Sequence, residues 1–195
     1  VSTARGLDII RRAKADGVGV TCEVSPHHLL LNEDDIEDYD TNFKMNPPLR
    51  TTEDNVALLE GLLDGSIDVI ATDHAPHTEF EKNLDFASAP FGIIGLETAL
   101  PSLFSRLVQT GKLPWDILVR TFSREPRRIL GLEVPDFHAG RQADFILFDP
   151  EASTHFSAET MESKSRNTPF LGQTLQGAVV QVVLGTELLL GRKQP

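Results

Sequence analysis

The sequence has a single cysteine, no long apolar run and no excess of basic residues. Cys22 has no partner for an internal disulfide bond, so we expect a buried structural thiol and a reducing, cytoplasmic compartment. No apolar run approaches the roughly 18 residues of a membrane-spanning helix, so no membrane span is expected. With 29 acidic and 18 basic residues the net charge is −11, which disfavours non-specific binding to nucleic acid or anionic lipid.

Several common catalytic motifs are also missing. The chain has no glycine-rich nucleotide-binding fingerprint, no Gly-x-Ser-x-Gly nucleophile elbow and no paired-cysteine zinc motif. Its 195 residues, 40% of them hydrophobic, are enough to bury a substantial core. The first residue is Val1 and a helix signal follows directly, so we expect the C-terminal portion of a longer protein.

Helical and strand patterns alternate over the first 135 residues. Runs with apolar residues at helical spacing follow Ser or Thr residues that can cap a helix, and short β-branched runs follow them. The helices are expected over residues 4–16 and from Thr51 or Thr52 to near Gly65, and the strands over residues 18–24 and 67–71. This alternation favours the α/β class, with a parallel sheet covered by helices.

Three further helices and then a change of pattern are expected. An apolar stripe runs from Leu96 to Leu107, and Pro101 must lie in its first turn or kink it. Two short helices follow over residues 115–122 and 124–130, the second capped by Ser123 and ended by Gly131. Beyond Pro135 the pattern predicts strands over residues 143–148, 177–184 and 187–190. We therefore expect two domains, residues 1–135 and a β layer over residues 136–195.

The densest cluster of titratable groups follows the strand predicted over residues 67–71. It contains Asp73, His74 and His77. Active sites of parallel α/β proteins collect at the C-terminal ends of strands, where a carboxylate can serve as a general base or bind a cation. The alternative is that Asp73 caps a turn and the histidines are ordinary loop residues, because one aspartate and two histidines do not make a metal site.

Other segments compete as candidate sites. His27 and His28 follow the strand predicted over residues 18–24, but adjacent side chains of an extended chain point in opposite directions. The two side chains are therefore not expected to bind the same metal ion, and one of them is expected to pack in the protein interior. Asn46, followed by two prolines, either offers a rigid amide to a carboxylate or amide substrate or anchors its loop. Residues 89–92 form either a substrate-facing loop or a turn.

Seven motifs, in order along the whole chain, resemble class I bacterial dihydroorotases of the amidohydrolase superfamily. They are Val1–Ala4, Glu23–Leu31, Lys44–Arg50, Ala71–His77, Ala89–Thr98, Ala143–Pro150 and Ser163–Phe170. The resemblance implies a (β/α)8 TIM-type barrel, with residues 18–24 and 67–71 as its last two strands and residues beyond about 135 as C-terminal strands of a small β-sandwich. It also implies zinc-dependent, reversible cyclisation of N-carbamoyl-L-aspartate to L-dihydroorotate in pyrimidine biosynthesis, with one or two zinc ions.

The resemblance also implies roles for individual residues. Asp73 matches the aspartate that contacts zinc and moves a proton between the bound hydroxide and the leaving amide nitrogen. Asn46 and His77 match residues that hold the substrate carboxylate, and Phe91 and Gly92 match backbone contacts to the pyrimidine ring. The family's other metal ligands have no counterpart here, so we expect the isolated chain to bind zinc weakly and to be inactive.

Two alternative functions stay open. One is another cyclic amidohydrolase of the allantoinase or hydantoinase type, although those relatives generally lack a histidine matching His77. The other is a non-catalytic dihydroorotase homologue that acts as a structural partner of aspartate transcarbamoylase. The expected partners are a small-molecule substrate, the N-terminal part of the same protein, and either a second copy or a transcarbamoylase.

Overall fold

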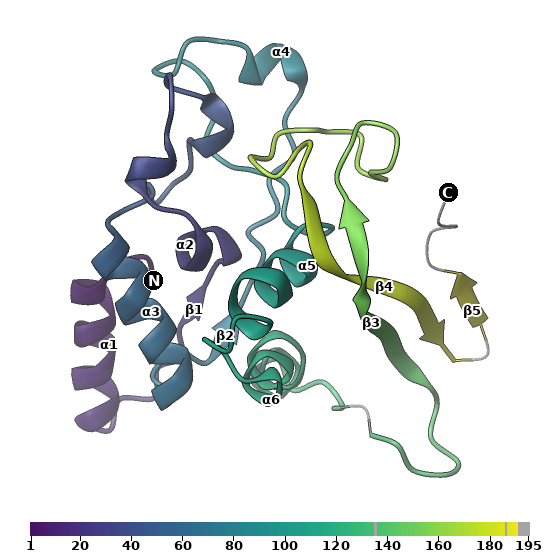
Figure 1. Cartoon of the computed structure of the whole chain (residues 1–195). Helices are drawn as coiled ribbons and strands as arrows, with labels where there is room; N and C mark the ends of the chain where they lie inside the picture. The colour runs from purple at the N-terminus through teal and green to yellow at the C-terminus, as the bar shows by residue number, and fades with distance from the viewer. Residues whose placement is uncertain (135, 186, 191–195) are drawn as a thin grey trace.

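The computed structural model describes residues 1–134, 136–185 and 187–190 (Figure 1). The expected domain boundary at Pro135 lies outside the described residues. The elements in chain order are α1 (Ala4–Ala15), β1 (Glu23–Val24), α2 (Pro26–Leu30), η1 (Glu33–Asp35), η2 (Thr41–Phe43), α3 (Thr52–Asp64), β2 (Val69–Ile70), α4 (Glu79–Lys82), α5 (Ala99–Leu103), η3 (Phe104–Val108), α6 (Trp115–Val119), η4 (Arg120–Arg124), α7 (Glu125–Ile129), β3 (Asp144–His155), β4 (Thr174–Leu184) and β5 (Glu187–Leu190).

Helices α1 and α3 lie side by side and confirm the first two predicted helices (Figure 1). The Thr3 hydroxyl oxygen accepts a hydrogen bond from the Gly6 N–H at 3.0 Å, which caps α1. Thr51 and Asp54 form a capping box at the start of α3. Asp54 also accepts a 2.8 Å hydrogen bond from the Ala4 N–H, so one carboxylate fixes the starts of both helices.

Strands β1 and β2 form a parallel pair in which Glu23 lies opposite Val69. Both strands are shorter than the predicted ranges 18–24 and 67–71. The Cys22 carbonyl accepts hydrogen bonds from the N–H groups of Asp68 and Val69 at 3.1 and 3.3 Å. The Cys22 N–H, however, donates to the Asp68 carboxylate at 2.8 Å rather than to a neighbouring backbone. The Asp68 carboxylate therefore takes the place of the backbone acceptor that a longer strand would give to the Cys22 N–H.

The segment after β1 is helical, which corrects the prediction of extended chain around His27 and His28. Helix α2 has Pro26 in its first turn, where a proline costs nothing because that N–H has no partner within the helix. His27 and His28 are only 3% and 5% exposed. Both therefore pack into the protein, whereas the sequence led us to expect that of one.

The helical region before the β layer is more continuous than predicted. Pro101 lies in the first turn of α5, as expected, and α5 continues into the π-helical turn η3. The two short helices predicted over residues 115–122 and 124–130 are one run, because the π-helical turn η4 joins α6 to α7. Ser123 lies inside η4 and is not an N-cap. Gly131 follows the helical run with a positive φ of 68°. This conformation is typical of a glycine that ends a helix, which is the role predicted for it.

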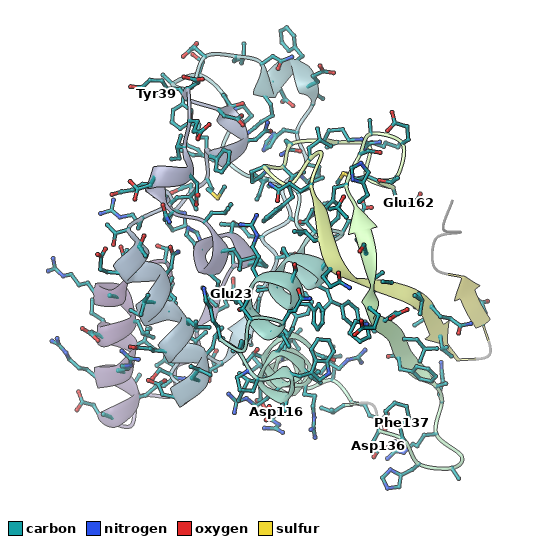
Figure 2. All side chains as sticks on the ribbon, in the orientation of Figure 1. Glu23, Tyr39, Asp116, Asp136, Phe137 and Glu162 are labelled. Carbon is teal, nitrogen blue, oxygen red and sulfur yellow. The ribbon has the colours of Figure 1, made fainter. Side chains whose placement is uncertain are left out.

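Strands β3, β4 and β5 form an antiparallel sheet in that order. β3 extends well beyond the predicted residue 148, and the register shifts between Asp149 and Ser153. Such an irregularity accommodates Pro150, which has no N–H for a regular ladder. Asp136 and Phe137 lie on the segment that leads from α7 to β3 (Figure 2). This sheet confirms the predicted change to strands beyond residue 135.

Two hydrophobic clusters form the core. The first lies between the α1–α3 pair and helices α5 and α6 and includes both short parallel strands, with Leu7, Leu58, Ile70, Leu103 and Leu118 among its buried members. The second joins loop residues Leu31, Met45 and Ile93 to C-terminal residues Phe156 and Phe170. The C-terminal segment is thereby packed against the loops that follow β1 and β2. Within the described part of the chain, no helix is long and apolar enough to cross a membrane.

Candidate active site

Asp73 lies just beyond the C-terminal end of β2, with an exposed side chain. Its backbone φ is 50°, in the left-handed region that residues other than glycine seldom adopt and that is found at functional sites. The Thr78 side chain, not Asp73, caps the following helix α4. Asp73 is therefore not the cap of α4, and its carboxylate is accessible for chemistry.

His74 fastens the Asp73 loop to the segment around Gly95. Its Nδ1 accepts hydrogen bonds from the N–H groups of Gly95 and Leu96 at 3.0 and 3.3 Å. An imidazole nitrogen that accepts carries no proton, so the proton is on Nε2 and the ring is neutral. Nδ1 is thus occupied by the backbone and is not free to bind a metal.

His77 is held between two loops. Its Nε2 lies 2.9 Å from the Phe91 carbonyl oxygen, which can only accept, so Nε2 donates this hydrogen bond. Nδ1 lies 3.9 Å from a Glu81 carboxylate oxygen. The structure therefore brings together two sequence-predicted site residues, His77 and Phe91, and leaves Nδ1 as the nitrogen that can face a ligand.

Two buried lysines hold the loop that contains Phe91 and Gly92. Lys44 Nζ donates to the carbonyls of Ala87 and Ala89 at 2.9 and 2.5 Å. Lys82 Nζ donates to the carbonyls of Pro90 and Gly92 at 3.1 and 3.2 Å. Burial lowers the pKa of Lys82, and the nearby Lys44 lowers it further.

Sequence reasoning missed both lysines. An isolated lysine in a loop is normally a surface residue, whereas these two are 8% and 6% exposed, respectively. The Lys44 ammonium also lies 4.6 Å from the centre of the Phe91 ring, a cation–π contact. The Phe91 ring is 54% exposed, so it covers the lysine on one side and meets solvent on the other.

Asn46 is exposed and follows the segment that contacts the Gly92 loop. The Gly92 N–H donates to the Lys44 carbonyl at 2.9 Å, two residues before Asn46. The peptide bond between Asn46 and Pro47 is cis. Among the hydrogen bonds of the described residues, none joins Asn46 to Asp73 or His77 directly. Asn46 thus lies on a neighbouring loop rather than in a shared hydrogen-bond network.

His28 is hydrogen-bonded to the loop that contains Asn46. Its Nε2 lies 2.9 Å from the Pro47 carbonyl oxygen and therefore donates, while Nδ1 accepts from the Ser25 hydroxyl at 2.6 Å. With one nitrogen donating and the other accepting, the ring is neutral, and burial lowers its pKa. The Asp73 carboxylate has a smaller, opposite effect and raises the pKa of His28.

The metal-binding capacity of these residues is limited. Over residues 1–134, 136–185 and 187–190, no group of three or more His, Cys, Asp or Glu side chains is arranged to hold a metal ion. A stable zinc site uses three or four protein ligands. Asp73 offers an accessible carboxylate, but the described residues do not bring together a complete zinc site.

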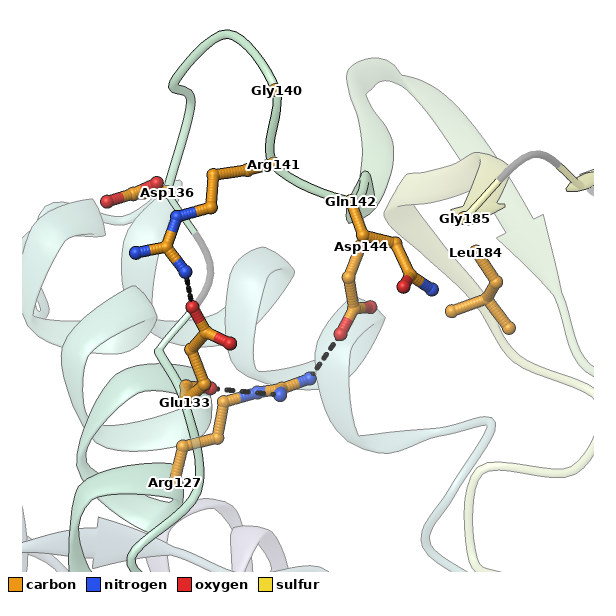
Figure 3. Close-up of a pocket in the computed structure, with 9 residues that line it drawn as sticks. All are labelled: Arg127, Glu133, Asp136, Gly140, Arg141, Gln142, Asp144, Leu184 and Gly185. Carbon is orange, nitrogen blue, oxygen red and sulfur yellow. Dashed lines mark hydrogen bonds and ion pairs between the residues drawn. The ribbon is translucent and has the colours of Figure 1, made fainter.

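A separate cavity of about 380 Å³ lies between the end of α7 and the sheet (Figure 3). It is lined by Arg127, Glu133, Asp136, Gly140, Arg141, Gln142, Asp144, Leu184 and Gly185. Arg127 pairs with Asp144 at 2.7 Å, and Arg141 pairs with Glu133. Because acidic partners already neutralise both guanidinium groups, this cavity is a weaker candidate site than the loops around Asp73.

Sequence comparison identifies relatives over almost the whole chain. The amidohydrolase family matches residues 4–189. Proteins named dihydroorotase from Bacillus cereus (strain B4264) and Bacillus thuringiensis (strain Al Hakam) are each 48% identical over 188 residues, or 96% of this chain. The match covers 44% of each Bacillus protein, so the chain spans less than half the length of these relatives.

Solved structures of related proteins have the same fold. The L-hydantoinase (dihydropyrimidinase) from Arthrobacter aurescens has a TM-score of 0.91 at 30% identity, covering 100% of this chain and 44% of that protein. The inactive dihydroorotase-like domain of a CAD-like multifunctional protein from Chaetomium thermophilum has a TM-score of 0.69 at 25% identity, covering 96% of this chain and 49% of that one. The predicted α/β class and partial barrel are confirmed, and the chain belongs to the amidohydrolase family.

Proposed function

We propose that this chain forms part of the active site of a dihydroorotase, a cyclic amide hydrolase that interconverts N-carbamoyl-L-aspartate and L-dihydroorotate in pyrimidine biosynthesis. The observation that carries the proposal is the 48% identity to Bacillus dihydroorotases over 96% of the chain. The geometry supports it, because Asp73 lies just beyond the C-terminal end of β2 and the nearby His77 is hydrogen-bonded to Phe91. We infer a cytoplasmic enzyme with a small-molecule substrate.

Asp73 is proposed as the proton-transfer group. Hydrolysis of the dihydroorotate ring adds water to the ring carbonyl, so the water loses a proton and the leaving amide nitrogen gains one. An exposed carboxylate at the end of β2 can accept the first proton and deliver it to the nitrogen. The left-handed backbone at Asp73 fixes where this carboxylate emerges from the loop.

Asn46 and His77 are proposed to bind the substrate carboxylate. A chain with net charge −11 needs local hydrogen-bond donors to bind an anion. The Asn46 amide is exposed, and His77 Nδ1 donates when the ring is protonated while Nε2 stays on the Phe91 carbonyl. The backbone at Phe91 and Gly92 is proposed to contact the pyrimidine ring.

We infer that the cofactor is zinc, as one or two ions, and that Asp73 is the ligand this chain contributes. Zinc bound in a hydrolase makes its water molecule more acidic. The remaining ligands would come from outside the described residues, in agreement with the chain's 44% share of the Bacillus relatives. The domain division at residue 135, with a C-terminal share of a β-sandwich over residues 136–195, is part of the same proposal.

Two other functions have specific support. The TM-score of 0.91 to an L-hydantoinase favours another cyclic amidohydrolase of the allantoinase or hydantoinase type. The similarity to an inactive dihydroorotase-like domain favours a non-catalytic homologue. Assembly with aspartate transcarbamoylase is part of that second alternative. The 48% identity to dihydroorotases exceeds the 30% and 25% of these two structures, and dihydroorotase is therefore our first proposal.

The test compares hydrolysis of dihydroorotate and hydantoin by the protein with its barrel complete and zinc supplied. Asp73→Asn is expected to lower kcat for dihydroorotate by about 100-fold or more, since general acid–base catalysis contributes about that much. Asp16→Asn, at the exposed C-cap of α1, is the matched control and keeps full activity. Preference for hydantoin would favour the hydantoinase type. Inactivity towards both, with co-purification of a transcarbamoylase, would favour the non-catalytic homologue.

A further inference from the structure

Asn167 lies in the C-terminal segment between β3 and β4. Its side chain nevertheless bonds to two loops of the candidate site, the loop that contains Ala75 and His77 and the loop that contains Phe91 and Gly92. Its Nδ2 donates to the carbonyls of Ala75 and Gly92 at 2.9 and 3.2 Å. Its Oδ1 accepts from the His77 N–H at 3.2 Å. The residue is 4% exposed, and both polar atoms of its amide are bonded.

The two loops that Asn167 joins run alongside each other with little space between them. His74 and Ile93 form a parallel β-bridge, and the Ala75 N–H donates to the Ile93 carbonyl at 2.8 Å. A Cβ at Gly92 would lie 2.5 Å from the Ala75 Cβ. The loops are thus in direct contact, and the Asn167 amide bonds to the backbone of each where they meet.

The segment that carries Asn167 is itself firmly placed. Phe156 and Phe170, on either side of it, are 0% and 2% exposed in the cluster that also contains Ile93. The Asn167 carbonyl accepts a 3.1 Å hydrogen bond from the Ile94 N–H. The amide is therefore held by a rigid support that lies outside the two loops.

We propose that Asn167 is a positioning residue, which fixes the backbone of His77 relative to that of Gly92 and so sets how the groups proposed to contact the substrate lie relative to one another. Two of its partners, His77 and Gly92, are residues that we propose contact the substrate, and the third, Ala75, lies two residues before His77. The effect on catalysis rests on the proposed dihydroorotase function. The effect on loop order does not, because it follows from the hydrogen bonds alone.

Two variants separate the parts of this interaction. Asn167→Asp keeps the shape and the acceptor for the His77 N–H, but it replaces the Nδ2 donor with an oxygen that repels both carbonyls. Asn167→Ala removes all of these hydrogen bonds. The matched control is Gln173→Glu in the same segment, whose Nε2 donates to the Pro169 carbonyl at 2.8 Å and which bonds to neither loop.

The first experiment is hydrogen exchange of the backbone amides, which needs no substrate. We expect both Asn167 variants to exchange about tenfold faster over residues 75–77 and 92–94, in line with the loss of one or two hydrogen bonds. Gln173→Glu should leave these residues unchanged. Unchanged exchange in the Asn167 variants would overturn the proposal, and if Asn167→Ala does not fold, Asn167→Asp alone decides the result.

The second experiment measures kcat and KM for dihydroorotate in the complete protein. A displaced binding region is expected to raise KM about tenfold in Asn167→Asp while kcat changes much less, whereas general destabilisation would lower the active fraction without raising KM. An unchanged KM would overturn the positioning role in catalysis. If the unmodified protein does not hydrolyse dihydroorotate, the proposed function fails, and the exchange experiment still decides whether Asn167 orders the loops.

Discussion

Gly92 is required by both backbone conformation and space. Its φ is 111°, and a Cβ there would lie 2.5 Å from the Ala75 Cβ. We expect Gly92→Ala to destabilise the fold by about 2–4 kcal/mol, combining backbone strain with the collision, as measured by urea denaturation. Gly111→Ala is the matched control, because Gly111 also has a positive φ, of 73°, but nothing within 4 Å of its Cβ position. Equal losses in the two variants would contradict the collision.

His27 gives the fold a pH dependence. It is 3% exposed, and its Nε2 has no hydrogen-bond partner among the described residues. Burial, with a smaller effect of His28, lowers its pKa from 6.5 to about 3. Below pH 6.5 the unfolded chain therefore binds a proton that the folded chain excludes until about pH 3. The contribution of neutral His27 to the free energy of unfolding is fully present above pH 6.5 and is lost as the pH falls from 6.5 towards about 3.

The measurement is urea denaturation at two pH values. Between about pH 7.5 and 5, His27 should contribute a loss of about 2 kcal/mol, and His27→Phe should remove that share of the slope. His155→Gln, at an exposed position, should leave the slope as it is. A parallel pH dependence in the parent and in His27→Phe would show that His27 is protonated in the folded protein.

Among the elements, α1 and α3 depend on one shared carboxylate. Asp54 accepts hydrogen bonds from the Ala4 N–H at 2.8 Å and the Thr51 N–H at 3.3 Å, and thus caps both helices. We expect Asp54→Ala to cost about 1–2 kcal/mol in thermal or urea denaturation. Glu60→Ala, on the exposed face of α3, should change stability by less than about 0.5 kcal/mol. A loss no larger than that of the control would mean that the capping bonds contribute little.

The elements that the sequence predicted well are those whose stabilising contacts are local. The cap of α1 by Thr3 and the box at Thr51 span three residues, so they are visible in the sequence. Helix α2 was missed because the residues after the strand predicted over 18–24 were expected to be extended, although a proline after a serine, as at Pro26, is typical of a helix start. The lengths of β1 and β2 were overestimated because pairing depends on distant partners, as Asp68 demonstrates at Cys22.

The same distinction between local and long-range contacts applies to the candidate site. Asp73 and His77 were recognisable because they follow a predicted strand within one short motif. Lys82 and Asn167 were not, because their partners lie up to 92 residues away along the chain. Which buried polar groups hold a loop is a property of the folded arrangement, and residue type alone does not indicate it.

At the scale of the whole molecule, one hydrophobic cluster connects regions that the sequence assigned to two domains. Met45 and Ile93 pack with Phe156 and Phe170, and the loops of the candidate site lie on this cluster. The C-terminal segment is therefore a structural support for the site. Changes in that segment, such as those at Asn167, are expected to reach the site through packing and hydrogen bonds.

Zinc binding is also a property of the whole chain, because a stable site needs several ligands at once. Asp73 offers one carboxylate, and zinc held by one protein ligand exchanges readily with water and with any chelator. We expect the 195-residue chain, titrated with Zn²⁺ against a chromogenic chelator, to bind zinc weakly and to leave dihydroorotate unhydrolysed. Asp73→Asn should behave like the parent in this titration, because losing one ligand of an incomplete site changes little. Tight binding at one zinc per chain would instead require ligands that the described residues do not bring together, and it would overturn the inference that the metal site is completed by protein outside this chain.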